Sequence, residues 1–150
     1  YKMLTRRTNF AVRLWGASST GNAPDPYYIG GLDTIRGFPF RSIVGSQAFY
    51  TNLEFRFPLI DYLAIPGFAL ANIRGNIFLD VGGAFYEDFQ GFRCYSSEES
   101  ALQDCLSSYG WGLSFRIFGM ELNWDFAKRW NFSETLSDGF ETSFWFGPRF

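Results

Sequence analysis

The side chains of this chain that are able to do chemistry are carboxylates, arginines and two cysteines. The 150 residues include no histidine, so no Ser-His or Cys-His nucleophile pair and no imidazole metal site can be built. Gly110 and Gly112 lack the third glycine and the following helix of a dinucleotide-binding loop. The carboxylates alternate with arginines, which favours a structural ion network over acid–base catalysis. We therefore expect no enzymatic activity, no cofactor and no metal site.

Cys94 and Cys105 lie in one long polar stretch, and the chain has no other cysteine. We expect a disulfide between them in an oxidising compartment, where it would restrict the stretch by roughly 2 to 4 kcal/mol of chain entropy. Two free thiols, or half of a metal site, are the alternatives. The same stretch is acidic, which predicts a solvated surface.

Polar and apolar residues alternate through most of the chain and predict β-strands, with no convincing helix. In the longest alternation Leu53, Phe55 and Phe57 share one face, while Glu54 and Arg56 share the other. The expected fold is all-β, with an antiparallel sheet that has one markedly polar face. Six strands are expected, at about Thr8–Ala17, Phe49–Leu59, Ile73–Tyr86, Tyr109–Phe118, Met120–Phe126 and Phe140–Phe150.

Composition favours a membrane protein that crosses by strands. Aromatic residues make up 21% of the chain, more than a soluble core needs, and no apolar run approaches the roughly 18 residues of a spanning helix. A spanning barrel needs only alternation over about ten residues. The net charge of −2 makes nucleic acid an unsuitable partner. The alternative is a soluble barrel or sandwich whose apolar face points inward.

The connections between the expected strands are uneven. Those at about 18–45, 87–108 and 128–139 are long and polar, whereas the connection near Gly119 is a tight turn. Outer-membrane barrels have this pattern, with long loops at one end and short turns at the other. The segment from Asp61 to Asn72 is expected to be a medium-length apolar connection, at a membrane interface or packed as an ordinary loop.

Several motifs, taken in order, resemble those of the outer-membrane biogenesis and secretion barrel superfamily, which includes BamA-type and TamA-type proteins, two-partner secretion transporters and bacterial surface antigens. The likeness covers nearly the whole chain from Phe10 onward. The motifs are the glycine-rich loop Tyr28–Phe38 ending in Arg36-Gly37-Phe38, the strand Asn52–Leu59, the F-x-D-x-G strand Phe78–Gly82, the strand Gly110–Ser114, and a carboxy-terminal targeting strand ending in phenylalanine.

The resemblance implies a latch inside the barrel. In the family the arginine of the loop folds into the lumen and pairs with acidic residues of the wall, so Arg36 would reach Glu54 and Asp80. The alternation independently places both carboxylates on the polar face, and a guanidinium can bind a carboxylate bidentately. Glycines at 30, 31 and 37 would allow tight turns. A solvated turn with a free Arg36 is the alternative. The implied residues are Arg36, Gly37, Phe38, Glu54, Phe78, Asp80 and Gly82 for the latch, and Phe146 and Phe150 for the targeting strand.

The resemblance further implies that residues 1–150 form the carboxy-terminal portion, about six strands, of a larger barrel of sixteen strands in the bacterial outer membrane. Upstream strands and periplasmic domains would lie outside this sequence. The expected function is insertion or export of client outer-membrane or secreted proteins through the barrel and its lateral seam. Expected partners are outer-membrane lipid, those clients and periplasmic accessory proteins. A passive membrane anchor and a soluble lipid-binding barrel are the alternatives.

Overall fold

The chain forms one large antiparallel sheet with two small hairpins. The computed structural model describes residues 2–3, 8–66, 68–86 and 91–148, and these residues form strands and loops without a helix. The sheet has seven strands in the order β1-β2-β5-β6-β9-β10-β11. Their bounds are Lys2–Met3 (β1), Asn9–Ser18 (β2), Gln47–Ile65 (β5), Phe68–Phe85 (β6), Leu106–Ile117 (β9), Met120–Arg129 (β10) and Glu141–Phe146 (β11).

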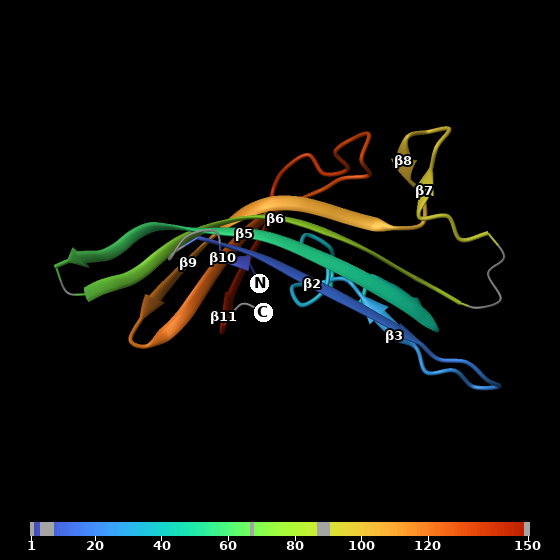
Figure 1. Cartoon of the computed structure of the whole chain (residues 1–150), viewed down its shortest axis with the longest axis horizontal. Helices are drawn as coiled ribbons and strands as arrows, with labels where there is room; N and C mark the ends of the chain where they lie inside the picture. The colour runs from blue at the N-terminus through green and yellow to red at the C-terminus, as the bar shows by residue number, and fades with distance from the viewer. Residues whose placement is uncertain (1, 4–7, 67, 87–90, 149–150) are drawn as a thin grey trace.

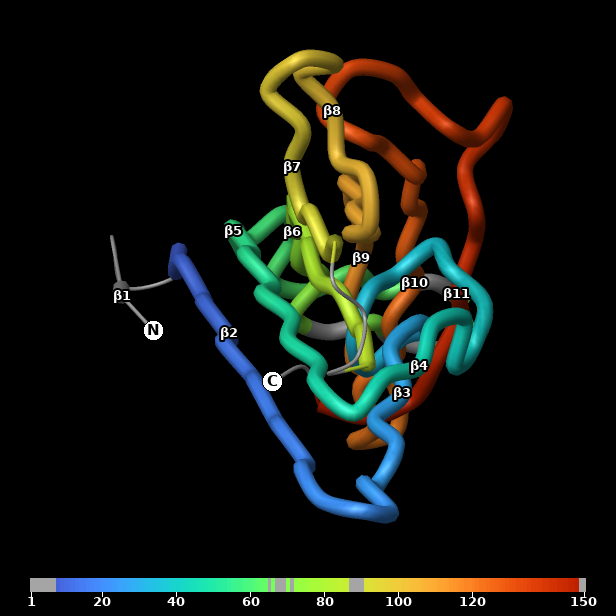
Figure 2. Tube along the Cα trace, turned by 90° about the vertical axis from the view of Figure 1, so that its right-hand side faces the viewer, coloured from blue at the N-terminus to red at the C-terminus, as the bar shows by residue number. Residues whose placement is uncertain are grey.

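The sheet is arched, and the loop between β2 and β5 lies beneath the arch (Figure 1). That loop contains a small hairpin of β3 (Tyr27–Ile29) and β4 (Ile43–Gly45). Figure 2 shows β2 and β11 at the two sides of the curved sheet. In the sheet as described, β11 pairs with β10 and β2 pairs with β5 and the short β1, so the sheet is open.

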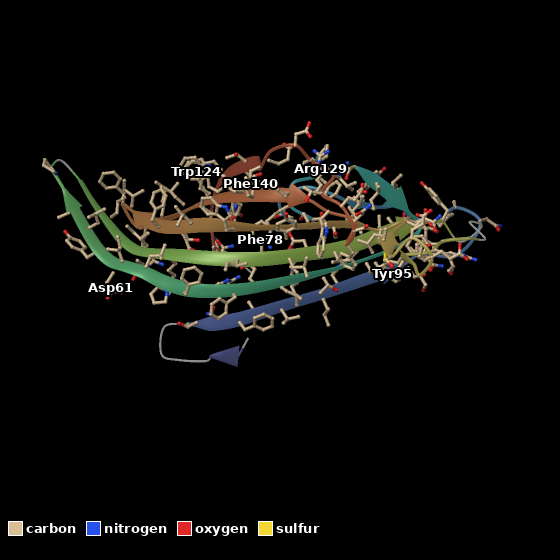
Figure 3. All side chains as sticks on the ribbon, turned by 90° about the horizontal axis from the view of Figure 1, so that it is seen from above. Asp61, Phe78, Tyr95, Trp124, Arg129 and Phe140 are labelled. Carbon is tan, nitrogen blue, oxygen red and sulfur yellow. A yellow bond between two sulfur atoms is a disulfide. The ribbon has the colours of Figure 1, made fainter. Side chains whose placement is uncertain are left out.

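The predicted division of the sheet into a polar and an apolar face is confirmed, and the polar face is the buried one. Asn52, Glu54 and Asp80 are at most 2% exposed. Large apolar side chains from six strands of the sheet are exposed on the opposite, convex face: Leu14, Phe55, Ile77, Trp111, Trp124, Phe144 and Phe146. Figure 3 shows side chains projecting along the length of the sheet. This arrangement is the reverse of a water-soluble sheet, in which the apolar face is covered.

The six long strands occur where they were predicted, but one connection was predicted wrongly. The segment from Asp61 to Asn72 is not a loop, because β5 continues to Ile65 and β6 begins at Phe68. The two strands form a long hairpin that extends past its neighbours at one end of the sheet (Figure 1). A register shift between Pro58 and Ile60 lies within it. Such a bulge changes which residues face outward.

The last strand is shorter than predicted, since β11 ends at Phe146. Phe146 is 65% exposed on the convex face. Phe150 lies outside the described residues.

The long connections leave the sheet at one end, as the sequence predicted, and the short connections lie at the other end. The turn at 118–119 joins β9 to β10. Asp61, near the turn end, and Tyr95, in a long connection, are far apart in Figure 3. Within the described ranges, no helix has the length and hydrophobicity to cross a bilayer.

Candidate functional site

The candidate site is the contact between the glycine-rich loop and the polar face of the sheet. Gly30, Gly31 and Gly37 have φ values of 116°, 103° and 81°, a left-handed region that glycine adopts without strain. Two hydrogen bonds close the turn between them, from the Gly31 amide to the Ile35 carbonyl and from the Thr34 amide to the Gly31 carbonyl, both 3.2 Å. The loop buries Ile29 and Ile35 completely against the sheet, beside Ala48.

Arg36 makes the contacts that the resemblance implied. Its Nε and Nη2 donate hydrogen bonds of 2.7 Å to Oδ2 and Oδ1 of Asp80, which is a bidentate pairing. Its Nη1 also pairs with Oε1 of Glu54, and its backbone amide lies 3.2 Å from Oδ2 of Asp80. Arg36 is only 4% exposed. The solvated-turn alternative is therefore wrong.

The F-x-D-x-G motif of β6 supplies three different contacts to this site. The ring centroid of Phe78 lies 3.7 Å from Cζ of Arg36, a cation–π distance. Asp80, two residues on, binds the guanidinium. A Cβ at Gly82 would lie 3.0 Å from Cδ1 of Ile35. The alternation of a strand thus places a stacking ring, an anion and a space for the loop in a row on one face.

The charges of the site are paired with one another. Glu54 is shared, because Nε and Nη2 of Arg56 lie 2.7 and 2.6 Å from its Oε2. Burial alone would lower the pKa of Arg36, but the attraction and hydrogen bonds of Asp80, together with Glu54 and Asp125, raise that pKa above its usual value. The guanidinium therefore stays charged, and a buried charge held in this way fixes the loop in one position.

Sequence reasoning missed several residues that complete the site. Asn52 donates hydrogen bonds from Nδ2 to the Thr34 carbonyl (2.6 Å) and to Oδ1 of Asp80 (2.8 Å). Arg13 of β2 donates to Oδ1 of Asn52 and to the Asp33 carbonyl. On β10, Arg129 donates to the Gly37 carbonyl. Alternation alone places Asn52 and Arg13 on the polar face, but their contacts depend on the strand register, which pairs Arg13 with Asn52.

Gly37 offers a direct test of the loop's fit. A Cβ at this position would lie 2.9 Å from Cβ of Ala127, and φ is unfavourable for other residues. We expect Gly37→Ala to lower the free energy of unfolding by about 1 to 3 kcal/mol. Urea titration is the measurement. Gly139→Ala is the control, because a Cβ there has no heavy atom within 4 Å and its φ is not positive. Equal effects would contradict close packing of the loop tip.

The disulfide between Cys94 and Cys105 is present, as predicted. It closes a hairpin of β7 (Tyr95–Ser96) and β8 (Ala101–Leu102). The Leu102 amide donates 2.7 Å to the Asn131 carbonyl, which joins this hairpin to the connection before β11. Phe92 stacks on Phe85 with ring centroids 4.2 Å apart. The bridge therefore holds a loop that is also attached to the sheet by side-chain packing.

Replacing both cysteines by serine is expected to loosen this loop and leave the sheet intact. Trypsin should then cleave faster after the exposed Arg93, because the loop loses a restraint of roughly 2 to 4 kcal/mol. Cleavage after Arg56, within β5, is the internal control and should stay slow. If cleavage accelerated equally at both positions, the bridge would be supporting the whole sheet.

The side chains of the site hold the loop against the polar face of the sheet. Within the ranges that the structure describes, no group of three acidic or cysteine side chains is placed to hold a metal ion. The acidic side chains at the centre bind arginines instead. Comparison of the chain with protein-family models, curated proteins and solved structures found no match. The resemblance to the barrel superfamily therefore depends on the sequence motifs alone.

Proposed function

We propose that this chain is the carboxy-terminal portion of an outer-membrane barrel that inserts or exports other proteins. The observation that carries the proposal is the buried Arg36, held by Asp80, Glu54 and Phe78 on the polar face of a sheet whose opposite face exposes large apolar side chains. An arginine loop seated in this way is what the resemblance to the superfamily implies.

The sheet buries its polar face and exposes its apolar face, which supports the membrane part of the proposal. Exposed Leu14, Ile77 and Phe144 are 74%, 56% and 52% accessible. A contiguous apolar face of this kind is stable where lipid tails cover it, while the ionic face lines a wet lumen. The same face argues against the soluble lipid-binding barrel, whose apolar residues would point inward.

The assembly part of the proposal follows from the resemblance to the superfamily. An edge strand presents unpaired backbone amides and carbonyls, to which an extended client strand can add. In the proposed mechanism the seated loop braces the wall, and β11 lies at the seam that receives the client. Upstream strands would complete the remaining wall, and periplasmic accessory proteins would deliver clients.

The test is reconstitution of the full-length protein in lipid vesicles with a urea-unfolded outer-membrane protein as client. We expect heat-modifiable migration of the reconstituted protein and faster acquisition of protease resistance by the client. Heat-modifiable migration without faster client folding would support a passive anchor instead. Failure to enter vesicles would overturn the membrane proposal as a whole.

A further inference from the structure

The tip of the loop has a second attachment to the same polar face of the sheet, at strand β10. Nε of Arg129, the last residue of β10, donates a 2.7 Å hydrogen bond to the Gly37 carbonyl. Its Cζ also lies 5.2 Å from the centroid of the Phe38 ring. Arg129 and Gly37 are 92 positions apart in the sequence. The loop tip is thus held by β6 through Arg36 and by β10 through the next residue.

The same guanidinium reaches the last strand. Nη2 of Arg129 lies 3.1 Å from Oε1 of Glu141, the first residue of β11. A groove of about 390 Å³ lies between the loop and β11, with Gly37, Phe38, Arg129 and Glu141 among its lining residues. Arg129 lines this groove and contacts both the loop and β11.

We propose that Arg129 is a positioning residue that couples the seated loop to the terminal strand β11. A planar guanidinium has several donors in a fixed arrangement, so one side chain can hold the Gly37 carbonyl and the Glu141 carboxylate together. With the loop seated, the start of β11 is held against β10. If the loop leaves, Arg129 loses its carbonyl partner and the Phe38 ring, and the edge strand is held less firmly.

This coupling deepens the proposed function and rests on it for its biological meaning. At a seam that accepts client strands, how easily β11 moves determines when its backbone edge is available for pairing with a client. The contacts of Arg129 with Gly37 and Glu141 would make the mobility of β11 depend on the position of the loop. The coupled element is the beginning of β11, where Glu141 pairs with Ala127 across the ladder.

Hydrogen exchange on the full-length protein in detergent micelles tests the coupling. We expect Arg129→Gln to increase amide exchange about tenfold both in the loop tip, residues 37–41, and in β11, which is the effect of losing one charge-assisted hydrogen bond. Exchange in Ile77–Val81 of β6 should not change. Arg129→Lys should restore less than half of the protection, because an ammonium lacks the fork that holds both partners.

Two further variants make the result decisive. Glu141→Gln should increase exchange in β11 and leave the loop tip nearly as before, since Arg129 keeps its bond to Gly37. Arg116→Gln is the matched control, because Arg116 of β9 lies at the tight-turn end of the β9–β10 pair, 3.9 Å from Glu121 of β10, and is half exposed. It should change neither region. If Arg129→Gln left β11 unchanged, or if Arg116→Gln changed both regions equally, the coupling would be overturned. The exchange experiment measures this contact directly, whereas client folding in vesicles measures the proposed function.

Discussion

Arg36→Ala is expected to lower the free energy of unfolding by about 3 to 5 kcal/mol and to abolish client assembly. The substitution leaves Asp80, which is 0% exposed, with the hydrogen bond from Asn52 but without its bidentate partner. Arg93→Ala is the control, because Arg93 is exposed in a neighbouring loop, and its effect should stay within about 0.5 kcal/mol. Urea titration and a complementation assay are the measurements. Equal effects of the two substitutions would contradict the latch.

Second substitutions separate the stability of the site from its function. In the Arg36→Ala background, Asp80→Asn should restore about 1 to 3 kcal/mol by removing the unpaired buried charge. Glu54→Gln should restore less, because Glu54 still has Arg56 as a partner when Arg36 is absent. Client assembly should not return in either double variant, since the loop remains unlatched. If Asp80→Asn and Glu54→Gln restored the same stability, Arg56 would not be compensating the charge of Glu54 as the contacts indicate.

Ile77→Arg is the second substitution with a large expected effect. Ile77 lies near the middle of β6, between Phe55 and Trp111 on the neighbouring strands, and is 56% exposed on the convex face. A charge at the middle of a lipid-facing strand destabilises a membrane barrel by about 2 to 4 kcal/mol. In water, the same exposed position would tolerate arginine with a change within about 0.5 kcal/mol. Urea titration of the protein folded in vesicles distinguishes the two environments.

Phe118→Arg is the matched control for that experiment. Phe118 is 85% exposed, but it lies in the tight turn at the end of the sheet. Near an interface, the effect of arginine falls to about 0 to 1 kcal/mol. A neutral result at both positions would contradict a lipid environment for the convex face. A large effect at both would indicate that the substitutions disturb folding for another reason.

The sequence predicted the strands and their two faces well because alternation directly reflects the geometry of a strand. It failed between Asp61 and Asn72, because the apolar residues at the start of this segment and just before it break the alternation and resemble an apolar loop: Leu59, Ile60, Tyr62 and Leu63. The bulge near Pro58 explains this failure, since one extra residue changes the phase of the pattern. The two small hairpins, β3–β4 and β7–β8, have strands too short to produce a recognisable pattern.

The contacts of the site could be predicted where a sequence motif indicated both residues. They could not be predicted where the strand register determines which residues meet. Arg36, Glu54 and Asp80 belong to motifs whose resemblance implied their pairing. No short motif connects Arg129 to Gly37, because that contact depends on how far β10 extends beyond Ala127 and on where the loop descends. Alternation assigns a residue to a face of the sheet, but strand order and register choose its neighbour.

An even number of long strands returns the chain to the side from which it entered. Apart from the two-residue β1, the sheet has six strands, and each reverses the direction of the one before it. The start of β2 at Asn9 and the end of β11 at Phe146 therefore both lie toward the tight turns. The segment from β2 to β11 therefore begins and ends at the same end of the sheet. The segment can thus be inserted into a larger sheet, or duplicated within one, without reversing the direction of the strands that follow it.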